Sequence, residues 1–214
     1  MTIPLPAEAV RHLTRSLRLG EGDPVVAFDD EGRTAPATLK RDGDAWLATL
    51  DDAPTAAEAL PELTVCCAVP KGPRADWLAE KLGELGVTRL VPLLTKHGVV
   101  DPGQGKVDRW RRLAAQAARQ SRSPGVLEIT EPLDVATALT ELGSGVVLTT
   151  ERPAAGLGQA SIVYIGPEGG WTEAELAQFD DAGCSFATLG VTVLRVETAA
   201  VAAAAVLRCG ATMP

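Results

Sequence analysis

Short apolar segments alternate with amphipathic segments along most of the chain, from residue 62 onward. The apolar segments have the length and composition of strands, and they cover residues 63–69, 89–93, 126–129, 146–149, 161–165 and 184–189. The segments between them have apolar residues at helical spacing, and they cover residues 74–85, 104–121, 134–142, 172–181 and 196–209. Strands that alternate with helices form a mainly parallel sheet with helices on both faces. This pattern predicts an α/β domain.

The first part of the chain has a different rhythm. Residues 6–19 have helical spacing, and strand-like runs follow at residues 24–28, 34–40 and 45–50. Acidic, glycine-containing turns separate these runs, and short strands joined by tight turns are typical of a small barrel or sandwich. The proline- and alanine-containing stretch 51–61 is expected to be a linker. We therefore expect a β-rich domain at residues 1–60 and the α/β domain at residues 61–214.

The composition narrows the class of protein. The chain has 214 residues, of which 46% are hydrophobic. Its longest apolar run, which ends at Leu207, is much shorter than the roughly 20 residues that cross a bilayer. The N-terminus lacks the basic start and apolar core of a secretory signal, so we expect a cytoplasmic protein. The four cysteines are expected to be buried free thiols, His12 and His97 to be structural, and no metal is expected.

Charge is unevenly distributed along the chain, whose formal net charge is −8. Residues 61–125 carry a net charge of +5, whereas the segments on either side are both negative. The basic residues are densest at 106–122. A local positive field attracts phosphates even on an acidic protein, because salt screens each charge beyond roughly 8 Å. This cluster is compatible with a surface for nucleic acid, and equally with a solvated helix face.

Three strand ends have unusual sequences, at residues 148–151, 165–170 and 189–199. Ligands of open parallel sheets bind beyond the carboxyl ends of the strands, so these segments are candidates for a ligand site. The second segment is the most informative, because Glu168 lies between a proline and two glycines where a strand leads into a helix. It has neither the dinucleotide-binding glycine pattern nor the lysine of a phosphate-binding loop. A ligand with less phosphate character is favoured. In the third segment, Arg195 and Glu197 stand at the start of an apolar helix, where they either pair with each other or serve a site.

Several motifs together resemble the signature of the 16S ribosomal RNA uridine-N3 methyltransferases (the RsmE type), which belong to the SPOUT superfamily. The match spans nearly the whole chain. The motifs are Ile165-Gly166-Pro167-Glu168-Gly169-Gly170-Trp171, Leu189-Gly190, Leu194-Arg195-Val196-Glu197-Thr198-Ala199, the segment from Arg15 to Asp23, Lys71 with Lys81 and Glu84-Leu85-Gly86-Val87, and Gln120-Ser121-Arg122 with one residue fewer than the family pattern.

The resemblance implies a fold and a cofactor. The N-terminal domain is expected to be a PUA-like β-barrel that helps to hold RNA, and the C-terminal domain a SPOUT-type α/β trefoil knot. Relatives act as homodimers with the last helix in the interface. S-adenosylmethionine is expected in the three strand-end loops. The residues implied to hold it are Leu148, Thr149, Gly166, Pro167, Glu168, Gly169, Gly170, Leu189, Gly190, Leu194, Glu197, Thr198 and Ala199.

The implied partner is 16S ribosomal RNA or the assembled small ribosomal subunit. Its phosphates would be held by Arg15, Arg18, Lys71, Arg74, Arg109, Arg111, Arg112 and Arg122. The N3 of uridine carries a proton in neutral water, so its methylation needs a group that accepts the proton and one that stabilises the resulting negative charge. The candidates for the first role are Glu168 and Glu197, and those for the second are Arg122 and Arg195. The sequence does not choose within either pair.

One segment departs from the family pattern. After the strand at 89–93 the family usually has a segment of the Thr/Ser-Glu-Arg-Ser type, and this chain has Thr95-Lys96-His97-Gly98. Arg119 also stands where relatives commonly carry an acid. The departures leave three alternatives open. They are a SPOUT methyltransferase for another RNA such as transfer RNA, a non-catalytic RNA-binding relative, and an unrelated nucleotide-dependent α/β enzyme.

Overall fold

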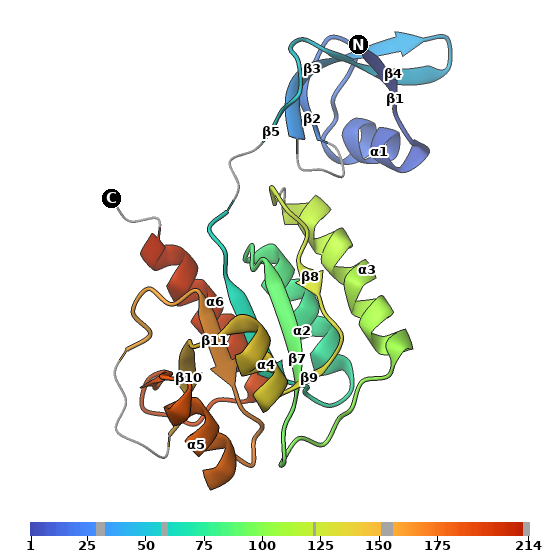
Figure 1. Ribbon diagram of the computed structural model, residues 1–214. Helices are drawn as coiled ribbons and strands as arrows, with labels where there is room; N and C mark the ends of the chain where they lie inside the picture. The colour runs from blue at the N-terminus through green and yellow to red at the C-terminus, as the bar shows by residue number, and fades with distance from the viewer. Residues whose placement is uncertain (29–32, 57–59, 122, 151–155, 212–214) are drawn as a thin grey trace. The chain divides into compact units, whose positions relative to one another are not determined.

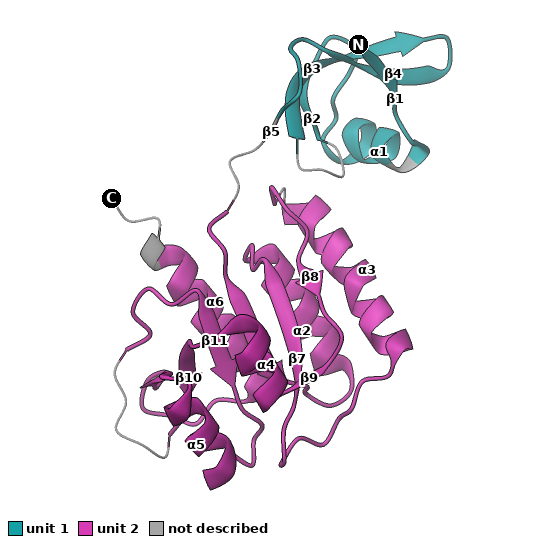
Figure 2. Cartoon of the chain, in the orientation of Figure 1, with its two compact units in different colours: residues 1–59 teal, residues 60–214 magenta. Residues whose placement is uncertain are grey.

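The computed structural model describes residues 1–28, 33–56, 60–121, 123–150 and 156–211. The chain forms two compact units, Met1–Ala59 and Leu60–Pro214, which are coloured separately in Figure 2.

The N-terminal unit is an antiparallel sheet with a short helix (Figure 1). Its strands are β1 (Thr2–Pro4), β4 (Ala45–Leu50), β3 (Arg33–Asp42) and β2 (Pro24–Phe28) in spatial order, and β5 (Thr55–Ala56) pairs with β3. Side chains at alternate positions of β3 and β4 form its core, with Ala35, Ala37 and Ala48 almost fully buried. The expected strands are confirmed, whereas β1 and β5 were not predicted because runs of two or three residues carry no readable alternation.

The predicted helix at residues 6–19 is wrong in its length. The structure has α1 (Ala7–Arg11) followed by a π-helical turn, η1 (His12–Ser16). The hydroxyl of Thr14 donates a hydrogen bond to the carbonyl of Val10 at 2.7 Å, and this bond competes with the helical ladder. Arg18 then takes a left-handed conformation with φ 57°, which ends the helical path before Gly20.

The C-terminal unit contains a sheet whose neighbouring strands all run parallel. Its spatial order is β12 (Ser185–Ala187), β10 (Val146–Leu148), β11 (Ile162–Ile165), β6 (Thr64–Ala68), β7 (Arg89–Leu94) and β8 (Glu128–Ile129). The short strand β9 (Leu133–Asp134) also pairs with β7 and was not predicted. Strand β10 pairs in parallel with both β11 and β12, so the carboxyl ends of these three strands lie next to one another.

Helices cover both faces of this sheet. The helices are α2 (Pro73–Glu84), α3 (Gln104–Ser121), α4 (Val135–Leu142), α5 (Glu173–Asp181) and α6 (Val196–Ala211). On β6, Val65 and Cys67 pack into one core with residues of α2, α3 and α6. Cys66, which points to the opposite face, packs with residues of α4 and α5. The predicted α/β fold with a covered parallel sheet is confirmed; the threading of the chain into a knot stays a prediction.

The burial of the cysteines departs from the prediction at two positions. Cys66 and Cys67 are buried, but Cys184 is only half-buried and Cys209 is exposed, so the expectation of four buried thiols is wrong for these two. Cys209 lies on the outward side of α6, where helical periodicity places every third or fourth residue in solvent. Within the residues that the structure describes, no helix combines the length and the hydropathy needed to cross a membrane.

Candidate functional site

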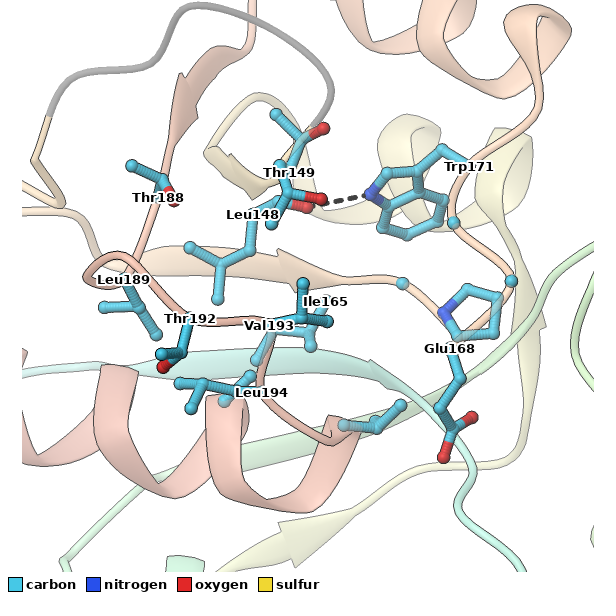
Figure 3. Close-up of a pocket in the computed structure, with 17 residues that line it drawn as sticks. Leu148, Thr149, Ile165, Glu168, Trp171, Thr188, Leu189, Thr192, Val193 and Leu194 are labelled. Carbon is cyan, nitrogen blue, oxygen red and sulfur yellow. Dashed lines mark hydrogen bonds between the residues drawn. The ribbon is translucent and has the colours of Figure 1, made fainter.

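A pocket of about 210 Å³ lies at the carboxyl ends of β10, β11 and β12. Figure 3 shows the side chains of three chain segments converging on it. Its lining is mainly apolar and hydroxyl-bearing, with Glu168 as the charged member. The lining residues are Leu148, Thr149, Thr150, Ile165, Gly166, Pro167, Glu168, Gly169, Gly170, Trp171, Thr188, Leu189, Thr192, Val193, Leu194, Val196 and Ala199.

The central wall is the loop that follows β11. The amide of Gly170 donates to the carbonyl of Pro167 at 2.9 Å, and Gly170 has φ 72°, a conformation that favours glycine. A Cβ atom on Gly166 would lie 2.8 Å from the ring of Trp171, so the ring requires a glycine beneath it. The indole Nε1 of Trp171 donates to the carbonyl of Leu148 at 3.0 Å, as the dashed line in Figure 3 shows. This bond ties the loop after β11 to the end of β10.

The helix after this loop begins with the capping box that the sequence contains. The hydroxyl of Thr172 accepts from the amide of Glu175, and Glu175 Oε2 accepts from the amide of Thr172 at 2.8 Å. Glu175 Oε1 also accepts from the amide of Lys96 at 2.9 Å. Burial acts to raise the pKa of Glu175, but the hydrogen bonds from the backbone of Thr172 and Lys96 outweigh it, so its pKa is lowered from 4.5.

The third wall is the segment between β12 and α6. Gly190 has φ 71° and turns the chain back across the pocket, so that Leu189 and Leu194 both line it. Val191 and Val193 are highly exposed, with 103% and 83% of their reference surface accessible. Val193 also lines the pocket, whereas Val191 does not, so the segment presents apolar surface both to the pocket and to solvent.

One arginine links two acidic residues beside the pocket. Arg74 Nη1 at the start of α2 lies 3.6 Å from Glu168 Oε1 and 3.4 Å from Glu197 Oε1. Glu197 is only 6% exposed, and its Oε2 is buried without a hydrogen-bond partner among the described residues.

The thiol of Cys67 lies near these acids. Its pKa is raised mainly by burial, and then by Cys66, Glu197 and Glu168 in decreasing order, so this buried residue remains a neutral thiol.

The predicted cofactor residues gather at this pocket with three differences. Gly190, Glu197 and Thr198 do not line it: Gly190 is the pivot of the third wall, Glu197 is turned toward Arg74, and Thr198 is exposed on α6. Lining residues that were not among the predicted cofactor residues are Thr150, Ile165, Trp171, Thr188, Thr192, Val193 and Val196. All of them except Thr192 are adjacent to predicted residues, and five of the seven lie within the three strand-end segments; Trp171 and Thr188 lie one position outside them.

The candidate catalytic residues lie in different environments. Glu168 lines the pocket, and its side chain is 50% exposed. Glu197 is buried in its pair with Arg74. Arg195 is exposed immediately before α6. Arg122 lies outside the described residues.

The predicted RNA-binding residues divide into accessible and engaged groups. Arg15 and Arg18 in the N-terminal unit, and Lys71 and Arg112 in the C-terminal unit, are exposed. Three of the others have structural partners, and Arg122 again falls outside the described residues. Arg74 pairs with Glu168 and Glu197, Arg109 pairs with Asp76 at 2.8 Å, and Arg111 binds the carbonyl of Ile129 and the carboxylates of Asp108 and Glu131.

The exposed face of α3 carries further cations. Lys106 and Arg119, which were not among the predicted RNA-binding residues, are exposed and lie at helical spacing with Arg109 and Arg112. Across the described ranges, no group of three or more histidine, cysteine, aspartate or glutamate side chains is arranged to hold a metal ion.

Comparisons with known proteins agree with this geometry. Residues 58–208 match the family model of the RNA methyltransferase domain, and residues 5–51 match that of the RNA methyltransferase PUA domain. Two relatives are ribosomal RNA small subunit methyltransferase E of Mycobacterium tuberculosis, 31% identical over 90% of this chain and 80% of that protein, and of Synechocystis, 29% identical over 92% of this chain and 70% of that protein.

Solved structures share the fold. The structure of ribosomal RNA small subunit methyltransferase E from Neisseria gonorrhoeae bound to S-adenosyl methionine has a TM-score of 0.75 and 29% identity, over 98% of this chain and 92% of that one. A Legionella pneumophila protein with bound cofactor also has a TM-score of 0.75, at 23% identity, and supports the fold alone. With a family model covering most of its length and relatives above 30% identity, the chain belongs to the ribosomal RNA small subunit methyltransferase E family.

Proposed function

We propose that this chain transfers a methyl group from S-adenosylmethionine to the N3 of a uridine in 16S ribosomal RNA. The observation that carries the proposal is the pocket built by three strand-end segments, in a chain of this family. The Neisseria gonorrhoeae relative has the same fold and is bound to S-adenosyl methionine. The identity of the methylated nucleobase, uridine, and of its methylated atom, N3, is inferred from the resemblance of the motifs around Glu168 and Glu197 to those of the family.

The pocket residues fit this cofactor. Leu148, Ile165 and Leu189 offer an apolar surface for an adenine ring, and the glycine-rich loop exposes main-chain groups that hydrogen-bond to a ligand. Among the described lining residues there is no lysine or arginine, as expected for a ligand that carries a cationic sulfonium and no phosphate. When bound, the cofactor supplies an electrophilic methyl group.

We assign the role of proton acceptor to Glu168. Glu168 is a lining residue whose side chain is half exposed, so an RNA base that approaches the pocket can reach it. Glu197 is unsuited to the same role, because it is buried and pairs with Arg74 outside the pocket lining. Arg74 lies within ion-pair distance of both Glu168 and Glu197, and this contact holds the Glu168 carboxylate in place.

We assign Arg195 the role of stabilising the negative charge that spreads over the flanking carbonyl oxygens of the base. It is exposed between Leu194 and Val196, both of which line the pocket. Arg122 remains a second candidate for this role from the sequence. The target base must leave its stack to reach such a pocket, and this step is easiest in a loop or single strand.

We further propose that the chain acts as a homodimer through α6. One side of α6 packs on the sheet and α2 through Ala200, Ala203 and Leu207, and the other side exposes Val206, with 53% of its reference surface accessible. The exposed Val191 and Val193 belong to the segment that leads into α6. An interface between two copies would remove these apolar side chains from water.

The test is methyl transfer from labelled S-adenosylmethionine to small ribosomal subunits from cells that lack this protein, with mass mapping of the product. We expect a single N3-methyluridine in 16S RNA. Glu168→Gln should lower kcat by about 10²- to 10⁴-fold, the usual contribution of a general base, while cofactor binding persists. Glu173→Gln is the matched control, because Glu173 is an exposed carboxylate nearby that does not line the pocket.

Three outcomes would contradict parts of the proposal. Methylation of transfer RNA but not of subunits would replace the substrate. Cofactor binding without transfer to any RNA would indicate a non-catalytic binder. An unchanged kcat in Glu168→Gln would remove Glu168 from the mechanism and leave the reaction itself intact.

A further inference from the structure

The segment that departs from the family pattern contacts the cofactor loop. Residues 95–98 follow β7 and form a tight turn, in which the amide of Gly98 donates to the carbonyl of Thr95 at 3.0 Å. Lys96 and His97 at the tip of the turn reach elements that lie more than 70 positions later in the chain. The amide of Lys96 bonds Glu175 in α5, and the ring of His97 bonds the loop after β11. The turn after β7 is therefore hydrogen-bonded both to the loop after β11 and to α5.

The hydrogen bonds of His97 determine which of its nitrogens carries a proton. Its Nδ1 lies 3.0 Å from the carbonyl oxygen of Gly169 and 3.2 Å from that of Gly170. Both neighbours are acceptors only, so Nδ1 must be the donor. The imidazole is then either the Nδ1–H tautomer or the imidazolium, and its Nε2 remains outside this contact. The side chain as a whole is exposed.

Packing makes the same contact specific. A Cβ atom on Gly169 would lie 3.0 Å from the Cβ of His97 and 3.3 Å from its Cγ. The imidazole therefore rests directly against the bare main chain of Gly169. Gly170, the second acceptor, holds φ 72° and is itself part of the pocket lining. One ring thus holds the carbonyls of two adjacent residues that line the pocket.

We propose that His97 is a positioning residue that holds the carbonyls of Gly169 and Gly170 and thereby keeps the pocket in the shape that binds S-adenosylmethionine. This inference rests on the proposed function. The histidine acts on the cofactor through the loop. It belongs to Thr95-Lys96-His97-Gly98, the segment in which this chain departs from the family pattern. The loss of the bond frees a loop whose conformation depends on left-handed glycine geometry, so the cost appears as weaker cofactor binding.

The first measurement is cofactor affinity by calorimetry, using S-adenosylmethionine and its demethylated product as probes. His97→Ala should weaken binding roughly 3- to 10-fold, the range of one net hydrogen bond. His97→Asn should restore affinity to within about 2-fold, because its amide nitrogen takes the place of Nδ1, whereas His97→Gln places its amide one bond further out and should not. The KM for the cofactor should follow affinity, with kcat at saturation little changed.

The second measurement needs no cofactor or activity. The chain has two histidines, so ¹⁵N spectra of histidine-labelled protein are assigned by the signal that disappears in His97→Asn. We expect His97 to carry its proton on Nδ1 in the free protein. A proton on Nε2 alone, with Nδ1 bare, would overturn the inference, and so would equal affinity in the wild type and His97→Ala.

The two failures are distinguishable. If the wild type and His97→Ala bind the cofactor equally well, the proposed function stands and His97 has no role in it. A wild type that binds no S-adenosylmethionine would overturn the proposed function, whatever the state of the imidazole. Circular dichroism of each variant separates a loss of affinity from a loss of folding, and His97→Asn provides the folded comparison.

Discussion

Glu175 shows how one residue of the sequence pattern serves two parts of the structure. Its spacing from Thr172 identifies it as half of a capping box, and the structure confirms that role. The same carboxylate, only 7% exposed, also accepts the amide of Lys96 from the turn after β7. The capping residue of α5 therefore also connects this helix to the segment that carries His97.

The protonation of Glu175 gives a prediction about stability. Because its folded pKa lies below 4.5, its contribution is fully present above pH 4.5 and is lost as the pH falls through the lowered value. Glu175→Gln replaces one acceptor oxygen with a donor and should cost about 1–2 kcal/mol at pH 7. The difference from the wild type should shrink below pH 4.5, as measured by urea unfolding. The exposed Glu173→Gln is the control, and a gap that stays constant down to pH 3 would refute the argument.

At the scale of the element, α3 separates two kinds of arginine. Arg111 is engaged by a carbonyl and two carboxylates, and it joins α3 to the segment around Ile129. Arg112, the next residue, points to the exposed face that also carries Lys106 and Arg119. The amphipathic pattern of the helix fixes which positions face solvent, but not which cations find acidic partners on neighbouring elements.

This division predicts which arginines bind RNA phosphates. Replacing Arg112 or Arg119 by Gln should make the slope of log affinity against log salt shallower by roughly 0.7–0.9 for each, measured on 16S RNA. Arg111→Gln should leave that slope unchanged and lower the stability of the fold instead. Equal salt slopes for all three variants would show that the exposed face of α3 does not bind the RNA backbone.

At the scale of the whole molecule, the exposed side of α6, which carries Val206, is the proposed dimer interface. We expect the wild type to sediment as a dimer, and Val206→Asp to shift it to the monomer because a charge in an apolar interface is strongly unfavourable. Val126→Asp is the control, since Val126 is also exposed, at 49%, but lies after α3. A monomeric wild type would exclude the proposed dimer, and a dimeric Val206→Asp would place the interface elsewhere.

The sequence alone was sufficient for much of the fold. Segments such as α3 and β2 were bounded as the structure has them, because period and turn residues are local signals. The glycine-rich loop was predicted to be a ligand site because an acid between a proline and two glycines is hard to explain as an ordinary strand-to-helix turn. Elements of two residues, such as β9, escaped because their pairing comes entirely from the neighbouring strand.

Contacts between distant residues were decided by the tertiary structure. Arg74 was predicted to bind RNA, which stays a prediction, and the structure places it against Glu197, 123 positions later in the chain. His97 was expected to be merely structural, and the structure places its ring on Gly169, 72 positions later. Both contacts form because the strand order sets β11, β6 and β7 side by side, and periodicity carries no information about that order. The sequence therefore determined the elements and their loops, while the sheet topology decided which side chains share a site.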